Sequence, residues 1–218
     1  MKKNKKLEHY IDQLVGAREL EMALFPEKFK EAGIDSNTFR KFYETTVISF
    51  ESKELAKHHN LFINYCAKVM DTRLYKGHSS AHNCHESCET VMRAIHAEDN
   101  LQLRNFLLEL KPQVTVGDVL VEGQPQYNVT KRSIKEIVAE GFNPNKYLNV
   151  HVWITLLDGT IFDPTIAATL VAKKMLPPQE INQMHIQPFG MDNNVNITYR
   201  PLLIDDEFYS RVDRDRSF

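Results

Sequence analysis

The spacing of apolar residues changes near Pro112, and this change limits the possible folds of the chain more than any other feature. From residue 5 to about residue 75, apolar side chains recur at intervals typical of helices, and residues 84–110 continue that pattern. After Pro112, β-branched and aliphatic residues surround Gly117 and Gly123, which indicates strands connected by turns. Helices followed by strands with short helices predict an α+β fold.

A β-hairpin is predicted where the dipeptide Asp158-Gly159 separates two apolar segments, residues 150–157 and 160–163. Asp-Gly is a strong signal for a two-residue turn between antiparallel strands. A turn of that length pairs Ile154 with Asp163. With strict alternation Asp163 then shares the face of Ile154, so a bulge or a register shift is needed to turn it toward the opposite face.

The first strand of this hairpin has two chemically different faces. One face is aliphatic and is expected in the core; it consists of Val152, Ile154 and Leu156. His151 and Trp153 alternate onto the other face. We therefore expect His151 and Trp153 to point toward a second surface, which a catalytic cleft would use.

We expect one integrated domain with three regions. Residues 1–76 are predicted to form a helical N-terminal region packed on a core of residues 77–204, and residues 205–218 a charged, frayed tail. Further elements expected within the core are helices at residues 133–140 and 165–174 and a last strand at residues 196–203.

A short polar segment, residues 77–83, leads into a predicted helix that begins at Cys84. A cysteine at a helix N-terminus lies near the positive end of the peptide dipoles, which favours the thiolate form. Cys88 falls on the apolar face of the same helix, and Cys66 on the apolar face of the preceding one. Cys84 is therefore the candidate nucleophile, and the other two cysteines are expected to pack in the core.

A helix-capping Cys84, a strand beginning His151-Val152-Trp153 and a strand ending Asp163-Pro164-Thr165 resemble the papain-like superfamily, especially its transglutaminase-like branch. The resemblance covers residues 77–96 and 149–165. It implies a helix bearing the cysteine packed on an antiparallel sheet. It further implies Cys84 as nucleophile, His151 as base, Asp163 as the residue that orients the base, and Trp153 beside the cleft.

The residues around the nucleophile are candidates for substrate binding. Asn83 is a candidate hydrogen-bond donor to the oxyanion, and His82 and His85 lie on either side of the pair Asn83-Cys84. The function predicted from this set is thiol-dependent acyl transfer, or hydrolysis of an amide or isopeptide bond, with a peptide, a protein or a small amide as substrate. Such a cysteine hydrolase or transglutaminase-like acyltransferase requires no cofactor.

Three alternatives remain open. Zinc binding is one, because His78, His82, Cys84 and Cys88 supply the nitrogen and sulfur ligands that zinc prefers. A catalytically inactive papain-like binding module is the second, with the helical first 75 residues as its interaction element. The third concerns Asp163 alone, since a carboxylate before Pro164-Thr165 can also cap the following helix.

The composition excludes several classes of protein. The 27 basic and 29 acidic residues are mixed along the chain and give a net charge of −2, which argues against a nucleic-acid binder. Apolar segments are too short to span a membrane, and the basic N-terminus is not followed by the apolar stretch of a signal peptide. The three cysteines form no disulfide framework. We expect a cytoplasmic protein without membrane association.

Overall fold

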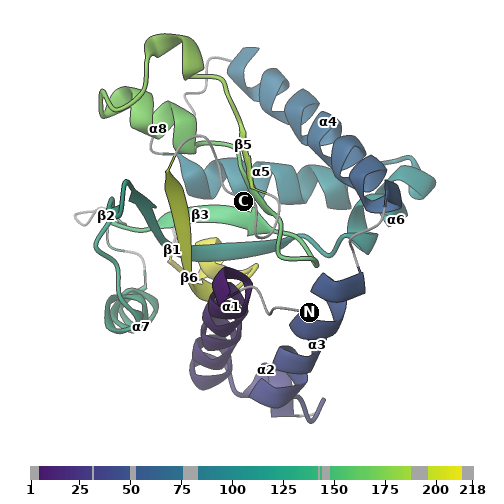
Figure 1. Cartoon of the computed structure of the whole chain (residues 1–218), viewed down its shortest axis with the longest axis vertical. Helices are drawn as coiled ribbons and strands as arrows, with labels where there is room; N and C mark the ends of the chain where they lie inside the picture. The colour runs from purple at the N-terminus through teal and green to yellow at the C-terminus, as the bar shows by residue number, and fades with distance from the viewer. Residues whose placement is uncertain are drawn as a thin grey trace. The chain divides into compact units, whose positions relative to one another are not determined.

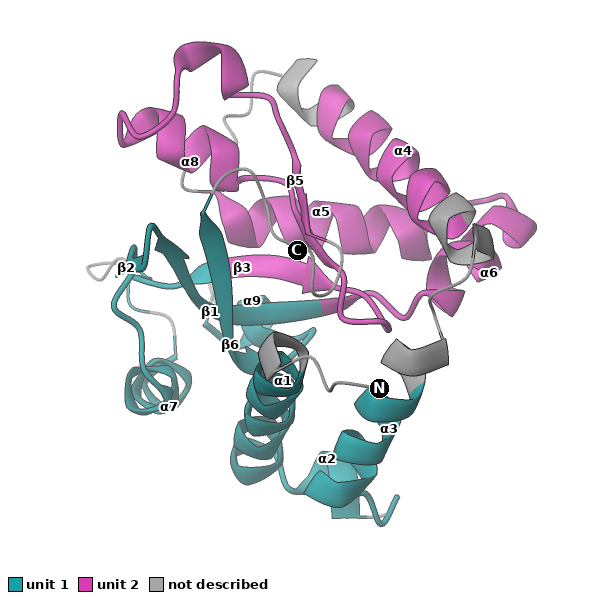
Figure 2. Cartoon of the chain, in the orientation of Figure 1, with its two compact units in different colours: residues 1–45, 114–151, 190–218 teal, residues 46–113, 152–189 magenta. Residues whose placement is uncertain are grey.

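The computed structural model describes residues 5–30, 32–49, 53–75, 83–141, 143, 148–187 and 196–212. Helices and antiparallel strands both occur, which confirms the predicted α+β class. The chain divides into two compact units (Figure 2). Unit 1 contains residues 1–45, 114–151 and 190–218, and unit 2 contains residues 46–113 and 152–189.

Unit 1 is built on an antiparallel arrangement of strands (Figure 1). Strand β1 (Gln113–Val121) pairs with β2 (Gln124–Pro125) and with β6 (Ile197–Ile204). The helices of this unit are α1 (Lys5–Leu24), α2 (Glu27–Lys30), the first part of α3 (Ser36–Ser49), α7 (Lys131–Glu140) and α9 (Phe208–Val212). Helix α1 packs against β6, and α7 contacts both β6 and α9.

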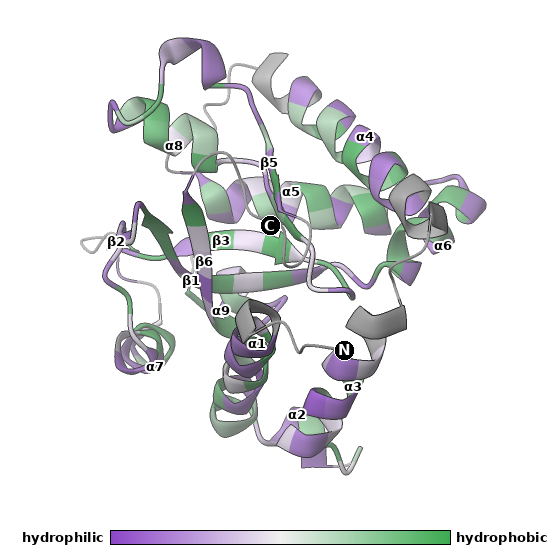
Figure 3. Ribbon diagram, in the orientation of Figure 1, coloured by the Kyte–Doolittle hydropathy of each residue, from purple (hydrophilic) through white to green (hydrophobic). Residues whose placement is uncertain are grey.

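Helix α7 begins at Lys131, two residues before the start predicted at residue 133. Helix α7 starts with a capping box, in which Thr130 and Ser133 exchange side-chain and backbone hydrogen bonds. Helix α1 carries both hydrophobic and hydrophilic residues along its length (Figure 3). Its apolar residues Leu14 and Ala17 are fully buried. None of the helices in the described part of the chain is long and apolar enough to cross a membrane.

Unit 2 combines helices with a second set of antiparallel strands. Its helices are α4 (Lys53–Tyr75), α5 (Cys84–His96), α6 (Leu101–Glu109), α8 (Ile166–Ala172) and the 3₁₀ turn η1 (Pro178–Glu180). Strand β4 (Ile161–Asp163) pairs with β3 (His151–Thr155) and with β5 (His185–Gln187). Helix α5 contacts α4 and α6. Phe62 of α4 meets Phe162 of β4 edge to face at 5.6 Å, which joins a helix to the strands in the core.

The hairpin between β3 and β4 differs from the predicted register by one residue. Ile154 pairs with Phe162 and Thr155 with Ile161, and Leu156 N–H donates to Thr160 O at 2.8 Å. The loop therefore has three residues and closes on Gly159, whose φ of +81° suits glycine. The predicted two-residue turn is wrong. A one-residue shift moves every side chain of β4 to the opposite face relative to β3.

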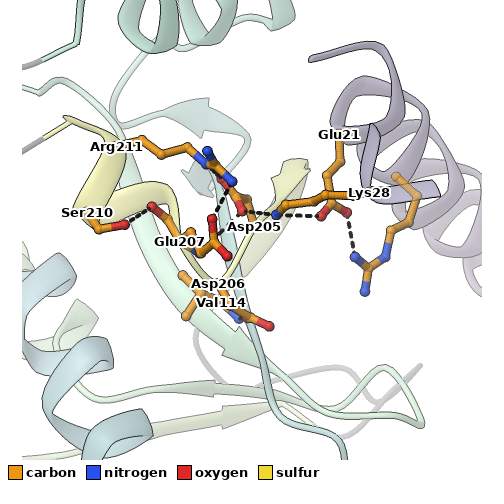
Figure 4. Close-up of polar contacts among 9 residues, drawn as sticks. Glu21, Lys28, Val114, Asp205, Asp206, Glu207, Ser210 and Arg211 are labelled. Carbon is orange, nitrogen blue, oxygen red and sulfur yellow. Dashed lines mark hydrogen bonds and ion pairs between the residues drawn. The ribbon is translucent and has the colours of Figure 1, made fainter. Parts of the chain in front are cut away.

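The described residues after β6, 205–212, pack within unit 1. Asp205 is buried and pairs with Lys28 at 2.9 Å and with Arg211 at 3.1 Å, and Lys28 also reaches Glu21 (Figure 4). Phe208 of α9 is 1% exposed. The expectation of a frayed tail is therefore wrong for residues 205–212, because a buried carboxylate and an apolar side chain hold this segment to the unit.

Candidate functional site

Cys84 is the first residue of α5 and is 5% exposed. Asn83 occupies the N-cap position but makes no side-chain capping hydrogen bond. The backbone N–H of Ser87 donates to Asn83 O at 2.9 Å, which closes the first turn. The thiol therefore lies at the positive end of a 13-residue helix, where the peptide dipoles stabilise a thiolate.

The imidazole of His85 contacts the candidate nucleophile. Its Nδ1 lies 3.7 Å from Cys84 Sγ, and the His85 side chain is half-buried. Sulfur and nitrogen at that separation form a weak hydrogen bond. Ser87, one turn further along the helix, is fully buried and its hydroxyl has no hydrogen-bond partner among the described residues.

The other two cysteines are packing residues, as predicted. Cys88 is 0% exposed and its thiol donates to Val152 O at 3.5 Å, so the sulfur is held between α5 and β3. Cys66 is also 0% exposed, and burial raises the pKa of its thiol. A thiol with a raised pKa is a poor nucleophile at neutral pH.

His151 opens β3 and is fully buried. Its Nδ1 lies 3.1 Å from the hydroxyl of Tyr127, and the two rings stack with centroids 5.2 Å apart and an interplanar angle of 21°. Trp153 is also fully buried, and its indole N–H donates to Thr155 Oγ1 at 3.1 Å. All five residues of β3 are buried, so the face of His151 and Trp153 is covered as well as the aliphatic face.

Asp163 caps helix α8. Its Oδ1 accepts hydrogen bonds from Thr165 N at 2.9 Å, from Thr165 Oγ1 at 3.2 Å and from Ile166 N at 3.0 Å. The capping interpretation of this carboxylate is therefore confirmed. The observed register, continued by one pair, also places Asp163 opposite Trp153, on the face to which alternation assigns His151.

His185 is a neighbour of Asp163 that the sequence did not single out. The two residues pair directly across β4 and β5. Burial lowers the pKa of His185, and the negative charge of Asp163 acts in the opposite direction. Strand β5 has only three residues, all half-buried, so its sequence lacks the alternation that would have identified it as a strand.

The three candidate catalytic residues lie on different elements. Cys84 and Asp163 belong to unit 2, and His151 is the last residue of the middle segment of unit 1. Their roles as nucleophile, base and orienting residue stay predictions, as do those of Asn83, His85 and Trp153 in substrate binding.

The zinc hypothesis concerns a set of residues that the structure describes only in part. His78 and His82 lie outside the described residues, as does the substrate-binding role given to His82. Within the described ranges, no group of three or more His, Cys, Asp or Glu side chains is arranged to hold a metal ion. Cys84 and Cys88 themselves lie one helical turn apart on α5.

Comparisons with known proteins leave the family of the chain open. No protein-family model matches it, and neither the curated proteins nor the solved structures contain a significant match.

Proposed function

We propose that this protein is a thiol-dependent enzyme that transfers or hydrolyses an acyl group, with Cys84 as its nucleophile. The observation that carries the proposal is the contrast among the three cysteines. Cys84 alone begins a helix, whereas Cys66 and Cys88 lie within helices and are completely buried. The dipole of α5 lowers the free energy of a thiolate at Cys84 and has no such effect on the other two.

The proposed reaction uses a thiolate as the nucleophile and an imidazolium as the general acid. The Cys84 thiolate attacks the carbonyl carbon of an amide, and the oxyanion that forms is held by N–H donors of the first turn of α5. The C–N bond breaks as His151 gives its proton to the leaving nitrogen, and a thioester remains on Cys84. Water or an amine then loses a proton to His151, attacks the thioester carbonyl and releases the thiolate.

The assignment of the base has two competitors in unit 2. His151 is favoured by the resemblance to transglutaminase-like enzymes and by the register that turns Asp163 to the face of Trp153. His85 has a ring nitrogen 3.7 Å from Cys84 Sγ, and His185 pairs with Asp163 across two strands. Replacing each histidine by glutamine, and measuring the reactivity of Cys84 in each variant, distinguishes the three.

The proposal is tested by the reactivity of the native protein toward iodoacetamide between pH 5 and pH 9, with the modified cysteine identified by mass spectrometry. We expect one fast-reacting thiol at Cys84, titrating below the free-cysteine value of about 8.5. Cys84→Ala removes the fast reaction. Cys88→Ala is the matched control, because it removes a thiol from the same helix and leaves the fast reaction in place.

The alternatives predict different results in the same experiment. A bound zinc ion, measured by metal analysis of the purified protein, together with cysteines that react only after chelation, would replace the enzyme proposal with a metal site. Slow alkylation of Cys84 in metal-free protein would favour a binding module that lacks thiol chemistry. Fast alkylation at Cys66 or Cys88 contradicts the assignment of Cys84.

A further inference from the structure

The hydroxyl of Ser87 is buried one helical turn after Cys84 on α5. The Ser87 side chain is 0% exposed, and its oxygen makes no hydrogen bond within the described part of the chain. A buried hydroxyl without a partner costs free energy, because it has lost its hydrogen bonds to water and gained none in the protein. Such a group in a folded protein needs an explanation.

We infer that the Ser87 hydroxyl donates a hydrogen bond to the Cys84 sulfur when that sulfur is ionised, and so stabilises the thiolate before it attacks the substrate. The inference rests on the proposed function, in which Cys84 is the nucleophile, and adds a residue to that site. A neutral thiol is a weak acceptor. A hydrogen bond to an ionised acceptor is roughly twice as strong as one between neutral groups, so the hydroxyl favours the thiolate over the thiol.

The spacing of the two residues places their side chains on the same face of α5. Residues three apart in a helix are neighbours, with Cβ atoms about 5–6 Å apart. Helical side chains also point back toward the N-terminus, so the side chain of Ser87 lies over the turn that contains Asn83 and Cys84. Rotation about χ1 of either side chain changes the separation of Oγ and Sγ without moving the backbone. The relation therefore depends on the geometry of one helix.

Thr90 shows how a hydroxyl on this helix is satisfied by the backbone. Its Oγ1 donates to Glu86 O, four residues earlier, at 2.6 Å. The equivalent acceptor for Ser87 is Asn83 O, which accepts from the backbone N–H of Ser87 at 2.9 Å. The Ser87 hydroxyl makes no such bond to that carbonyl. It is therefore not committed to the backbone and can donate to the sulfur.

The surroundings of the sulfur are compatible with this donor. Cys88 and Val91, which share the buried face of α5 with Ser87, are both 0% exposed. A hydrogen bond formed out of water in this way is electrostatically stronger than one at the surface. His85 Nδ1 lies 3.7 Å from Cys84 Sγ. A thiolate sulfur accepts several hydrogen bonds at once, so the hydroxyl adds to the contact with His85.

The test compares Ser87→Ala with Thr90→Val as the matched control. Ser87→Ala removes the unpaired hydroxyl, and Thr90→Val removes from the same helix a hydroxyl that has a backbone acceptor. The first readout is the rate of alkylation of Cys84 by iodoacetamide over the same pH range as before, with the modified residue identified by mass spectrometry. The second readout is the free energy of unfolding in urea.

We expect Ser87→Ala to raise the pKa of the Cys84 thiol by about one unit, the effect of one hydrogen bond to a charged group. Well below both pKa values the variant has about tenfold less thiolate, but a thiolate of higher pKa is more nucleophilic, so alkylation slows only about threefold. Above both pKa values the variant reacts about threefold faster, and the two pH–rate profiles cross. Its free energy of unfolding stays the same or rises, because alanine leaves no buried hydroxyl unpaired.

Thr90→Val is expected to keep the wild-type pH profile and to lower the free energy of unfolding. Coincident profiles for the wild type and Ser87→Ala overturn the inference, as does a rate that falls by the same factor at every pH. A loss of stability in Ser87→Ala as large as that in Thr90→Val also overturns it, because the hydroxyl would then be satisfied in the resting fold. Slow alkylation of Cys84 in the wild type overturns the proposed function instead, and the inference with it.

Discussion

Cys84 and Cys88 lie one turn apart on α5, and their different surroundings follow from that single turn. The first residue of a helix has its side chain beside unpaired backbone N–H groups, whereas the fifth lies over a completed turn. Cys88 accordingly packs against β3, and its thiol donates a hydrogen bond to Val152 O. Helical periodicity predicted this difference, because it assigns Cys88, Val91 and Ile95 to one buried face.

Two substitutions at Asp163 test its structural role as a cap separately from the catalytic role proposed for it. We expect Asp163→Ala to lower the free energy of unfolding by about 2 kcal/mol, because the start of α8 loses three hydrogen bonds from a buried cap. Asp163→Asn keeps an acceptor oxygen in the same place and is expected to cost about 0.5 kcal/mol. Urea unfolding of the two variants measures the difference. Equal losses would contradict the capping role.

At the scale of elements, the β3–β4 hairpin shows how loop length determines which side chains share a face. Asp158-Gly159 is compatible with a two-residue turn and with the last two residues of a three-residue loop. The structure has the longer loop, which Asp158 closes by accepting hydrogen bonds from Thr160 N at 3.0 Å and from Thr160 Oγ1 at 2.9 Å. The extra residue turns Asp163 from the face of Ile154 to that of Trp153.

The same loop contains the buried carboxylate of Asp158, whose protonation makes the stability of the fold depend on pH. Burial raises the pKa of Asp158, but an ion pair with His59 at 3.0 Å and the hydrogen bonds from Thr160 lower it more, so the net pKa lies below its usual value of 3.8. A group whose pKa is lower in the folded state contributes stability above its unfolded pKa and loses it as the pH falls through the folded value. Asp158 therefore stabilises the fold fully only above about pH 5.

We expect Asp158→Asn to make the free energy of unfolding less dependent on pH in the acidic range. Between pH 6 and pH 3 the free energy of unfolding should fall more steeply in the wild type than in the variant, because the variant has no carboxylate to protonate. Urea unfolding at intervals across this range measures both slopes. Parallel curves would show that Asp158 is not coupled to folding through its charge.

At the scale of the whole molecule, the chain leaves and re-enters each unit, and distant segments complete each core. In unit 1 the segment after β6 returns to the N-terminal helices through Asp205, which pairs with Lys28 and Arg211 (Figure 4). Arg211 also lies over the ring of Phe25 at 4.0 Å. The N-terminal and C-terminal segments of the described chain are therefore parts of one core.

We expect Asp205→Ala to lower the free energy of unfolding by about 3 kcal/mol, because Lys28 and Arg211 lose the buried carboxylate that they share and keep only Glu21 and Glu207 as partners. This value is at the low end for a buried pair, since Lys28 and Arg211 are 29% and 26% exposed. Asp12→Ala is the matched control: Asp12 pairs with Arg40 at the surface, and its loss should cost less than about 1 kcal/mol. Equal losses in urea unfolding would mean that burial of Asp205 contributes nothing.

The sequence by itself determined the features that depend on neighbouring residues: the α+β class, the start of a helix at Cys84, the existence of a hairpin at Asp158-Gly159, and the helix that Asp163 caps. These follow from periodicity, turn chemistry and capping, which act over a few residues. Tertiary structure alone decided the hairpin register, the burial of both faces of β3, the pairing of Asp163 with His185 and the contact of Tyr127 with His151. Each of these features brings together segments or surfaces whose relation cannot be read from local sequence patterns. The arrangement that forms is the one that buries the most apolar area while it pairs the polar groups.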